Sequence, residues 1–324
     1  MRALPDDRRE LIDALVAEAD VGDVTAGLLE KDEHLTTALQ AIFKLRFEHA
    51  TLVFCGGTSL SKAHGLIERM SEDADIKVVL SAATSNWSNN QLRRYLGDEV
   101  RGQIVNALTA IGLVEDVNAR RSLNDNHYLH SQWAYQRTYD GIVALRPNLQ
   151  LELTARSPAL PIETALLGTL ADKLAQRMGD TFSAPVVSIS ETLAEKVLSF
   201  LRRFAQHRAG LMQQPWDTAL VRHIYDVHCI IFHKPESIHN AMSAFPALAA
   251  LDASEFGHQD AAFQKDPKAT LVNALYRLST DKQSRDEYQQ VLLPLIYGKS
   301  RFSYEEVMGS FSATAHQLIN ALQA

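Results

Sequence analysis

The sequence has few of the features that mark secreted or membrane-spanning proteins. Only two of its 324 residues are cysteines, Cys55 and Cys229, which argues against a disulfide framework. No apolar stretch approaches the roughly 18 residues that a membrane-spanning helix needs. The segment Met1 to Glu10 carries charges of both signs and no apolar signal region. We therefore expect a soluble cytoplasmic protein that has no membrane partner.

Positive charge is also scarce. The formal net charge is -7, which excludes a protein that binds nucleic acid through its overall charge. An RNA partner would have to bind a local basic patch. The composition, with 46% hydrophobic and 22% charged residues, is that of an ordinary globular protein with material for a core. The length suits two subdomains.

The clearest chemical signal begins at a glycine pair. A short apolar run ending at Phe54 leads into Gly56-Gly57-Thr58-Ser59, which predicts a buried strand, a turn and a helix beginning near Leu60. Thr58 or Ser59 is the expected helix cap, and exposed amides at a helix start favour phosphate. No Gly-Lys-Ser/Thr follows, so this is not a Walker A loop. Taken alone, the motif is more often a plain turn.

An acid pair follows about fifteen residues later in the chain. Asp73-Ala74-Asp75 leads into the β-branched run Ile76 to Leu80, which predicts a second strand. Residues i and i+2 of a strand share a face, so both carboxylates point the same way. Paired carboxylates suit Mg²⁺ or Mn²⁺. A lone Asp-x-Asp is more often a solvated turn, but strand, glycine turn, helix and acid pair together indicate metal-assisted phosphoryl chemistry.

The two motifs together resemble a family signature. Gly56-Gly57-Thr58 followed by Arg69-Met70-Ser71-Glu72-Asp73-Ala74-Asp75 is similar to the GG(S/T)…R-x-S-x-D-x-D pattern of the nucleotidyltransferase AbiEii/AbiGii toxin family. That family includes the MenT toxins and belongs to the DNA polymerase β-like nucleotidyltransferase superfamily. The resemblance covers roughly residues 35 to 235.

The resemblance implies an α+β fold. We expect a polymerase β-like nucleotidyltransferase core, with a mixed sheet flanked by helices, over residues 1–180 and a mainly helical C-terminal domain over residues 185–324. Within the motif, Arg69 would orient the loop or contact phosphate, and Ser71 would hydrogen-bond the loop that carries the aspartates. A simple ion pair of Arg69 with Glu72 or Asp73 is the alternative.

A third carboxylate is predicted on a neighbouring strand. The alternation in Leu149-Gln150-Leu151-Glu152-Leu153-Thr154 places the leucines on one face and Glu152 on the other. The polymerase β-like fold has its third acid on a strand beside the acid pair, which makes Glu152 the candidate, although many relatives have aspartate there. An exposed glutamate without a catalytic role is the alternative. With Asp73 and Asp75, Glu152 would hold two metal ions.

The second half of the chain is expected to be mainly helical. We predict a helix over Thr164 to Met178, a linker-like break from Gly179 to Pro185, and a short strand from Val186 to Ile189. Thr192 and Glu195 have the spacing of a capping box, which predicts a helix running to about Arg208.

The family has a second signature in this region, a lysine followed later by R-(D/H)-x-x-D. The sequence contains Glu195-Lys196 and, further on, Arg222-His223-Ile224-Tyr225-Asp226. The resemblance implies that Lys196 contacts the triphosphate and that Asp226 is the acid that holds the lysine. His223 stands where aspartate is frequent, so no role of that carboxylate is carried over.

The expected activity is metal-dependent transfer of a nucleoside monophosphate from a nucleoside triphosphate (NTP) to an acceptor hydroxyl, with release of pyrophosphate. The resemblance implies the toxin of a toxin–antitoxin or phage-defence pair, with tRNA 3′ ends as acceptor and a separate antitoxin protein as partner. Two alternatives stay open: nucleotidylation of a protein side chain or of a small molecule such as an aminoglycoside, and a catalytically silent binding module. The sequence does not identify the NTP.

Overall fold

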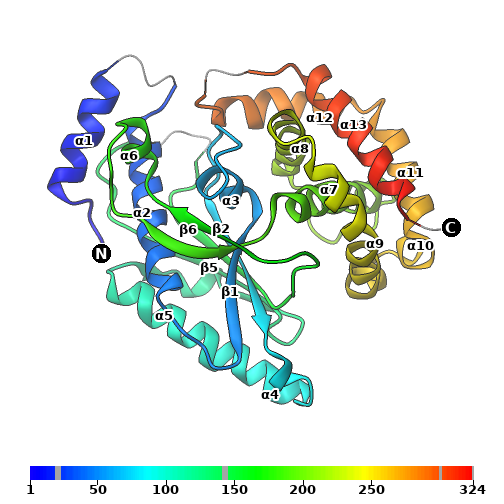
Figure 1. Cartoon of the computed structure of the whole chain (residues 1–324), viewed down its shortest axis with the longest axis horizontal. Helices are drawn as coiled ribbons and strands as arrows, with labels where there is room; N and C mark the ends of the chain where they lie inside the picture. Colours follow the sequence, from blue (N-terminus) through cyan, green and yellow to red (C-terminus); the bar gives the residue numbers. More distant parts are fainter. Residues whose placement is uncertain (19–22, 141–144, 299–300, 323–324) are drawn as a thin grey trace. The chain divides into compact units, whose positions relative to one another are not determined.

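The computed structural model describes residues 1–18, 23–140, 145–298 and 301–322. The chain divides into two compact units. Unit 1 comprises Met1–Pro158, Ile162–Val187 and Tyr297–Lys299, and unit 2 comprises Ala159–Pro161, Ser188–Ile296 and Ser300–Ala324. Figure 1 shows the helices and strands of both units.

Unit 1 is built on a mixed β-sheet. Among the described residues eight strands form it, in the order β3-β5-β6-β2-β1-β8-β7, with β4 paired to β5. β2 runs parallel to β6, β1 runs parallel to β8, and the other pairs are antiparallel. The strands are β1 (Ala50–Cys55), β2 (Asp73–Leu80), β3 (Val114–Glu115), β4 (Arg121–Leu123), β5 (Tyr128–Ala134), β6 (Leu149–Thr154), β7 (Glu163–Leu167) and β8 (Phe182–Val186).

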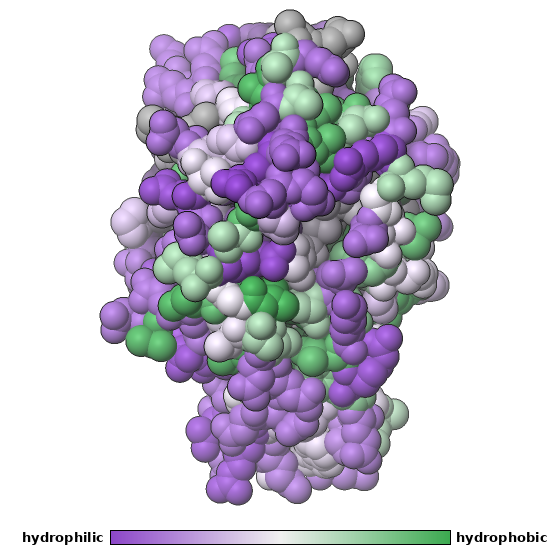
Figure 2. All heavy atoms as spheres, turned by 90° about the vertical axis from the view of Figure 1, so that its left-hand side faces the viewer, coloured by the Kyte–Doolittle hydropathy of each residue, from purple (hydrophilic) through white to green (hydrophobic). Residues whose placement is uncertain are grey.

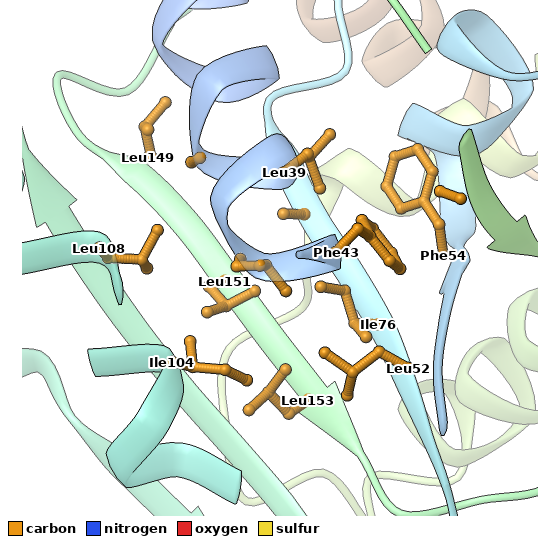
Figure 3. Close-up of a cluster of buried hydrophobic side chains, with 14 of the residues drawn as sticks. Leu39, Phe43, Leu52, Phe54, Ile76, Ile104, Leu108, Leu149, Leu151 and Leu153 are labelled. Carbon is orange, nitrogen blue, oxygen red and sulfur yellow. The ribbon is translucent and has the colours of Figure 1, made fainter. Parts of the chain in front are cut away.

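Helices α2 and α5 cover one face of this sheet (Figure 3). The described α-helices of unit 1 are α1 (Asp6–Ala17), α2 (Ala26–Phe43), α3 (Gly56–Lys62), α4 (Asn89–Arg94), α5 (Arg101–Ala110) and α6 (Leu170–Leu174). α4 continues through a π-helical turn, η2 (Tyr95–Val100), into α5. Thr25 caps α2 by accepting a hydrogen bond from the amide of Leu28.

The main core of unit 1 lies between the sheet and helices α2 and α5. Figure 3 shows α2 crossing the strands, with α5 beside it and the side chains of all these elements meeting. Every second residue of a strand points to this core, because side chains alternate between the two faces of a sheet. The core residues labelled there are Leu39, Phe43, Leu52, Phe54, Ile76, Ile104, Leu108, Leu149, Leu151 and Leu153.

Unit 2 is mainly helical. Its described α-helices are α7 (Ile189–Arg208), α8 (Arg222–His233), α9 (Ser237–Phe256), α10 (Ala261–Lys265), α11 (Pro267–Leu278), α12 (Lys282–Glu287) and α13 (Tyr304–Asn320). Aromatic side chains form part of its core: the ring centroids of Phe200 and Phe311 lie 5.3 Å apart, and those of Phe200 and Phe204 lie 6.0 Å apart. The α+β expectation, with a mixed sheet flanked by helices, is therefore confirmed.

The helix predicted over Thr164 to Met178 is wrong in its first part. Residues 163–167 form β7, which pairs antiparallel with β8, and only Leu170–Leu174 are helical. The linker expected over 179–185 is wrong as well, because β8 begins at Phe182. The segment has good helix formers, but its pairing with β8 decides the local conformation.

Two predicted helix starts also need correction. α7 begins at Ile189, where a strand was expected, and its cap is Ser188, whose hydroxyl accepts from the Glu191 amide, rather than Thr192. α3 begins at Gly56 and has no side-chain cap, whereas the sequence predicted a start near Leu60 with a hydroxyl cap. The two hydroxyl residues of that turn make other contacts, which bear on the site.

The face on the side of α1 is mostly polar (Figure 2). Figure 2 shows the face on the side of α1, where hydrophilic residues predominate and hydrophobic ones form small separate groups. Within the ranges that the structure describes, no helix has the length and apolar character needed to cross a membrane.

Candidate active site

The candidate site is organised by the turn between β1 and α3. β1 and β2 are antiparallel, and their register places Cys55 opposite Asp75. The next residue, Gly56, has a φ of +75°, a conformation that other residues rarely adopt. A Cβ at this position would lie 1.9 Å from Oδ2 of Asp75. Glycine is therefore required here both by the backbone and by the adjacent carboxylate.

The three predicted acids lie on the sheet face opposite the core. Asp73 and Asp75 alternate along β2 with Ala74 and Ile76, which are buried in the core. The parallel register of β2 and β6 places Asp75 directly opposite Glu152. Cross-strand neighbours point to the same face of a sheet. The fold thus brings all three carboxylates together on one surface.

The Thr58 hydroxyl fastens the turn to the acid-bearing strand, and the Ser59 hydroxyl bonds within the turn. The Thr58 hydroxyl is buried, donates to the main-chain carbonyl of Asp73, and lies 2.9 Å from the hydroxyl oxygen of Ser71. The Ser59 hydroxyl donates to the carbonyl of Gly56 at 2.9 Å. The Thr58 contacts hold α3 against the start of β2, and neither hydroxyl caps the helix.

Arg69 and Ser71 face a cavity of unit 1. The Arg69 side chain is buried and donates to the Met70 carbonyl at 3.0 Å. With Ser71, it lines a cavity of about 480 Å³ that also includes Lys173, while the three predicted acids are not part of its wall.

Two residues at the acids had no signal in the motifs. The guanidinium Nη1 of Arg146 lies 3.1 Å from Oδ1 of Asp73. Tyr128, on β5, has a hydroxyl that hydrogen-bonds to Glu152; burial raises the pKa of Tyr128, and the charge and hydrogen bond of Glu152 raise it further. The Tyr128 contact depends on the register of β5 and β6, and the Arg146 contact depends on how its backbone is held. A short sequence pattern predicts neither of these contacts.

The second signature forms an ion pair within unit 2. Nζ of Lys196 on α7 lies 2.7 Å from Oδ2 of Asp226 on α8, and their side chains are 7% and 0% exposed. The ring Nδ1 of His223 lies 3.2 Å from the main-chain carbonyl oxygen of Lys196, which is within hydrogen-bond distance. Burial lowers the pKa of His223 well below its ordinary value, and the Lys196 charge acts in the same direction. The residue is therefore neutral near pH 7.

The donor set at the acids suits a divalent metal. All three groups are carboxylates on one face, and hard oxygen donors of this kind fit Mg²⁺ or Mn²⁺. Asp73 already meets a cation in the structure, the guanidinium of Arg146. Among the described residues no three His, Cys, Asp or Glu side chains are gathered closely enough to form a finished metal centre. Binding would therefore require the three carboxylates to draw together.

Comparisons with known proteins place the chain in a family. No curated protein sequence matches it. One matching structure is the nucleotidyltransferase toxin MenT4 of Mycobacterium tuberculosis H37Rv, with 18% identity, a TM-score of 0.37, and coverage of 96% of this chain and 99% of that one. The model of the family described as nucleotidyl transferase AbiEii toxin, type IV toxin–antitoxin system, matches residues 37–310. The chain therefore belongs to the AbiEii nucleotidyltransferase toxin family.

Proposed function

We propose that this protein transfers a nucleoside monophosphate from an NTP to an acceptor hydroxyl on RNA, at the surface formed by Asp73, Asp75 and Glu152. The observation that carries the proposal is the register of two parallel strands, which sets Asp75 opposite Glu152 while Asp73 shares their face. The gathering of three carboxylates on one face is the arrangement that metal-assisted phosphoryl transfer needs.

Asp73, Asp75 and Glu152 would hold Mg²⁺ or Mn²⁺. A bound divalent ion supplies positive charge to the phosphates of the NTP. Glu152 accepts the proton of the acceptor hydroxyl, whose oxygen attacks the α-phosphorus. The bond from that phosphorus to the bridging oxygen breaks, and pyrophosphate leaves with its electron pair. The hydrogen bond from Tyr128 holds the Glu152 carboxylate in one orientation.

The remaining residues bind the triphosphate. The main chain from Gly56 to Ser59 contacts the β- and γ-phosphates, through amides, because the hydroxyls of Thr58 and Ser59 are engaged within the protein. Arg69 and Ser71 keep the connecting loop in place. Lys196 neutralises charge that develops on the leaving pyrophosphate.

Asp226 is the positioning residue for this lysine. It is fully buried and binds Nζ directly, so it limits the movement of the ammonium group. The assignment of Lys196 and Asp226 rests on the second signature and on their ion pair.

The acceptor in this proposal is the 3′ end of tRNA, in the cytoplasm. Membership of a type IV toxin–antitoxin family supports a toxin role and a separately encoded antitoxin. The motif resemblance favours tRNA as the acceptor. The net charge of -7 means that the RNA must meet a local basic surface.

The test is incubation of the purified protein with each of four α-³²P-labelled NTPs, Mg²⁺ or Mn²⁺ and total tRNA, followed by a denaturing gel. We expect label on tRNA with at least one NTP. Prior periodate oxidation of the tRNA 3′ terminus should abolish the signal, because the acceptor hydroxyls are destroyed. Asp73→Asn should abolish it as well, without unfolding the protein.

The matched control is Asp98→Asn, an exposed acid on η2. It makes the same chemical change away from the site and should leave labelling intact. Label on the protein alone would indicate that the acceptor is a protein and that tRNA is not the acceptor. Absence of label under every condition would favour a small-molecule acceptor or a silent binding module. Full labelling by a folded Asp73→Asn variant would contradict the metal assignment.

A further inference from the structure

A buried ion pair holds the main chain of Arg146 at both of its hydrogen-bonding groups. Nζ of Lys31, on α2, pairs with the carboxylate of Glu72, and the two side chains are 1% and 2% exposed. The same Nζ donates to the carbonyl of Arg146 at 2.7 Å. The amide of Arg146 donates to Oε2 of Glu72 at 2.9 Å. Residue 146 is thereby fixed between two buried charges.

Such a pair is a poor means of gaining stability. Moving two charges out of water is costly, and the attraction between them offsets this cost only when hydrogen bonds satisfy the remaining groups. Here those hydrogen bonds go to the backbone of Arg146. The main structural effect of the pair is therefore the placement of this arginine.

The guanidinium end is held much less firmly than the backbone. It lies 3.1 Å from Asp73, and the two side chains are 47% and 28% exposed. Ion pairs with this much exposure contribute little to stability, because water and salt screen them. Glu72 directly precedes Asp73, so one segment fixes the base of the arginine and also carries its partner. The backbone of Arg146 is therefore fixed, while its guanidinium can be displaced from Asp73.

We infer that Arg146 is a built-in competitor for the metal site, a cation that binds Asp73 until a divalent metal ion replaces it. This inference rests on the proposed function, which assigns Asp73 to the metal. A guanidinium and a divalent ion cannot share the same carboxylate oxygen without repulsion. Arg146 thus raises the metal concentration at which the site fills, and it offsets the charge of Asp73 while the site holds no metal.

The test measures metal binding without any nucleotide. Mn²⁺ is titrated into the full-length protein, and the electron paramagnetic resonance signal of free Mn²⁺ reports the fraction bound. Arg146→Ala and Arg146→Gln should each tighten Mn²⁺ binding by about fivefold, the factor expected when an exposed competing ion pair is removed. Added salt should narrow the difference, because it screens the same pair.

The matched control is Arg9→Ala. Arg9 has a similarly exposed side chain, 44%, and pairs with Asp6 on α1, so the variant loses the same charge and a similar ion pair elsewhere. Unchanged Mn²⁺ affinity in Arg9→Ala together with tighter binding in Arg146→Ala supports the inference. Equal or weaker binding in Arg146→Ala overturns it.

Asp73→Asn separates this inference from the proposed function. If Asp73→Asn abolishes Mn²⁺ binding and Arg146→Ala leaves it unchanged, the metal site stands and the competitor role fails. If Asp73→Asn leaves Mn²⁺ binding at the wild-type level, or the wild-type protein binds no Mn²⁺, the metal assignment itself fails and the competitor role fails with it.

Discussion

The Cβ position of residue 56 and the carboxylate of Asp75 exclude each other: a methyl group on Gly56 would lie 1.9 Å from Oδ2. The backbone of Gly56 is in the left-handed region as well, with a φ of +75°. We expect Gly56→Ala to destabilise the fold by about 1–3 kcal/mol. It should also lower nucleotide transfer by at least about a hundredfold, because Asp75 must move by more than the tolerance of a catalytic group.

Chemical unfolding and the labelled-NTP assay measure these two effects. The control is Gly102→Ala in α5, where an added Cβ meets nothing within 4 Å. Alanine should be neutral or should stabilise that helix by about 0.5–1 kcal/mol, with full activity. Wild-type transfer by Gly56→Ala would show that the position of Asp75 is unimportant.

Tyr128 should affect catalysis more than stability. Tyr128→Phe removes the hydroxyl that hydrogen-bonds to Glu152. A hydrogen bond to a charged group contributes about 1.5–3 kcal/mol, so we expect kcat to fall by about tenfold or more while the KM for NTP stays nearly constant. Initial rates over a range of NTP concentrations separate the two parameters. Tyr276→Phe, at a tyrosine that is 76% exposed in unit 2, should have no effect; a fall in KM alone for Tyr128→Phe would rule out the orienting role.

The Lys196–Asp226 pair allows stability and activity to be separated. Lys196→Met leaves the carboxylate of Asp226, 0% exposed, without its lysine partner. We expect a loss of about 3–5 kcal/mol in the free energy of unfolding, as for other broken buried pairs. The double variant Lys196→Met/Asp226→Asn should recover much of that stability but none of the transfer activity. Recovery of transfer in the double variant would mean that Lys196 acts only in the fold.

His34 should make the protein sensitive to acid. Its ring is fully buried, lies tilted against the ring of Tyr135 with centroids 4.2 Å apart, and has no hydrogen-bond partner for either nitrogen among the described residues. Burial, with a smaller contribution from the charge of Arg2, lowers the pKa of His34 to about 3 from its ordinary 6.5. Below the ordinary value the unfolded chain binds a proton that the folded chain does not, so stability falls as the pH falls.

The expected contribution is about 1.4 kcal/mol per pH unit between the two pKa values, or about 2 kcal/mol at pH 5. His34→Phe keeps a ring for Tyr135 and removes the titration, so its unfolding free energy should depend less steeply on pH. Urea unfolding at several pH values measures the slope. His239→Phe, at an exposed histidine, should leave the slope unchanged. An unchanged slope for His34→Phe would show that His34 is protonated in the folded state.

The sequence predicts those parts of the fold that depend on local alternation. Leu149 to Thr154 reads as a strand with Glu152 on its polar face, and the structure has that strand with the same bounds. Where a segment's conformation depends on a distant partner, local reading fails. Residues 163–167 contain helix formers, yet they form β7 because β8 is available to pair with them.

For the candidate site as well, the sequence shows the residues that lie in short motifs and misses the contacts between distant parts of the chain. The motifs locate the acids, the glycine turn and the lysine, because each lies in a short pattern. The contact of Arg146 with Asp73 depends on a buried ion pair from α2, and that of Tyr128 with Glu152 depends on the register of β5 and β6. Neither is encoded by spacing along the chain. The contacts of Thr58 with Ser71 and Asp73 could not be predicted from the sequence either, because the same hydroxyl could have capped the helix.

Strand β2 carries both the candidate metal ligands and residues of the hydrophobic core. Along β2 the acids at 73 and 75 alternate with core residues at 74 and 76, so consecutive codons are under different constraints. In a saturation mutagenesis library, substitutions at Ala74 and Ile76 should reduce the amount of protein in the cell. Substitutions at Asp73 and Asp75 should leave the amount of protein intact and lower its toxicity. Protein abundance should therefore respond to substitutions at positions 74 and 76, and toxicity without loss of abundance to substitutions at 73 and 75. This alternation could be detected from the library data alone.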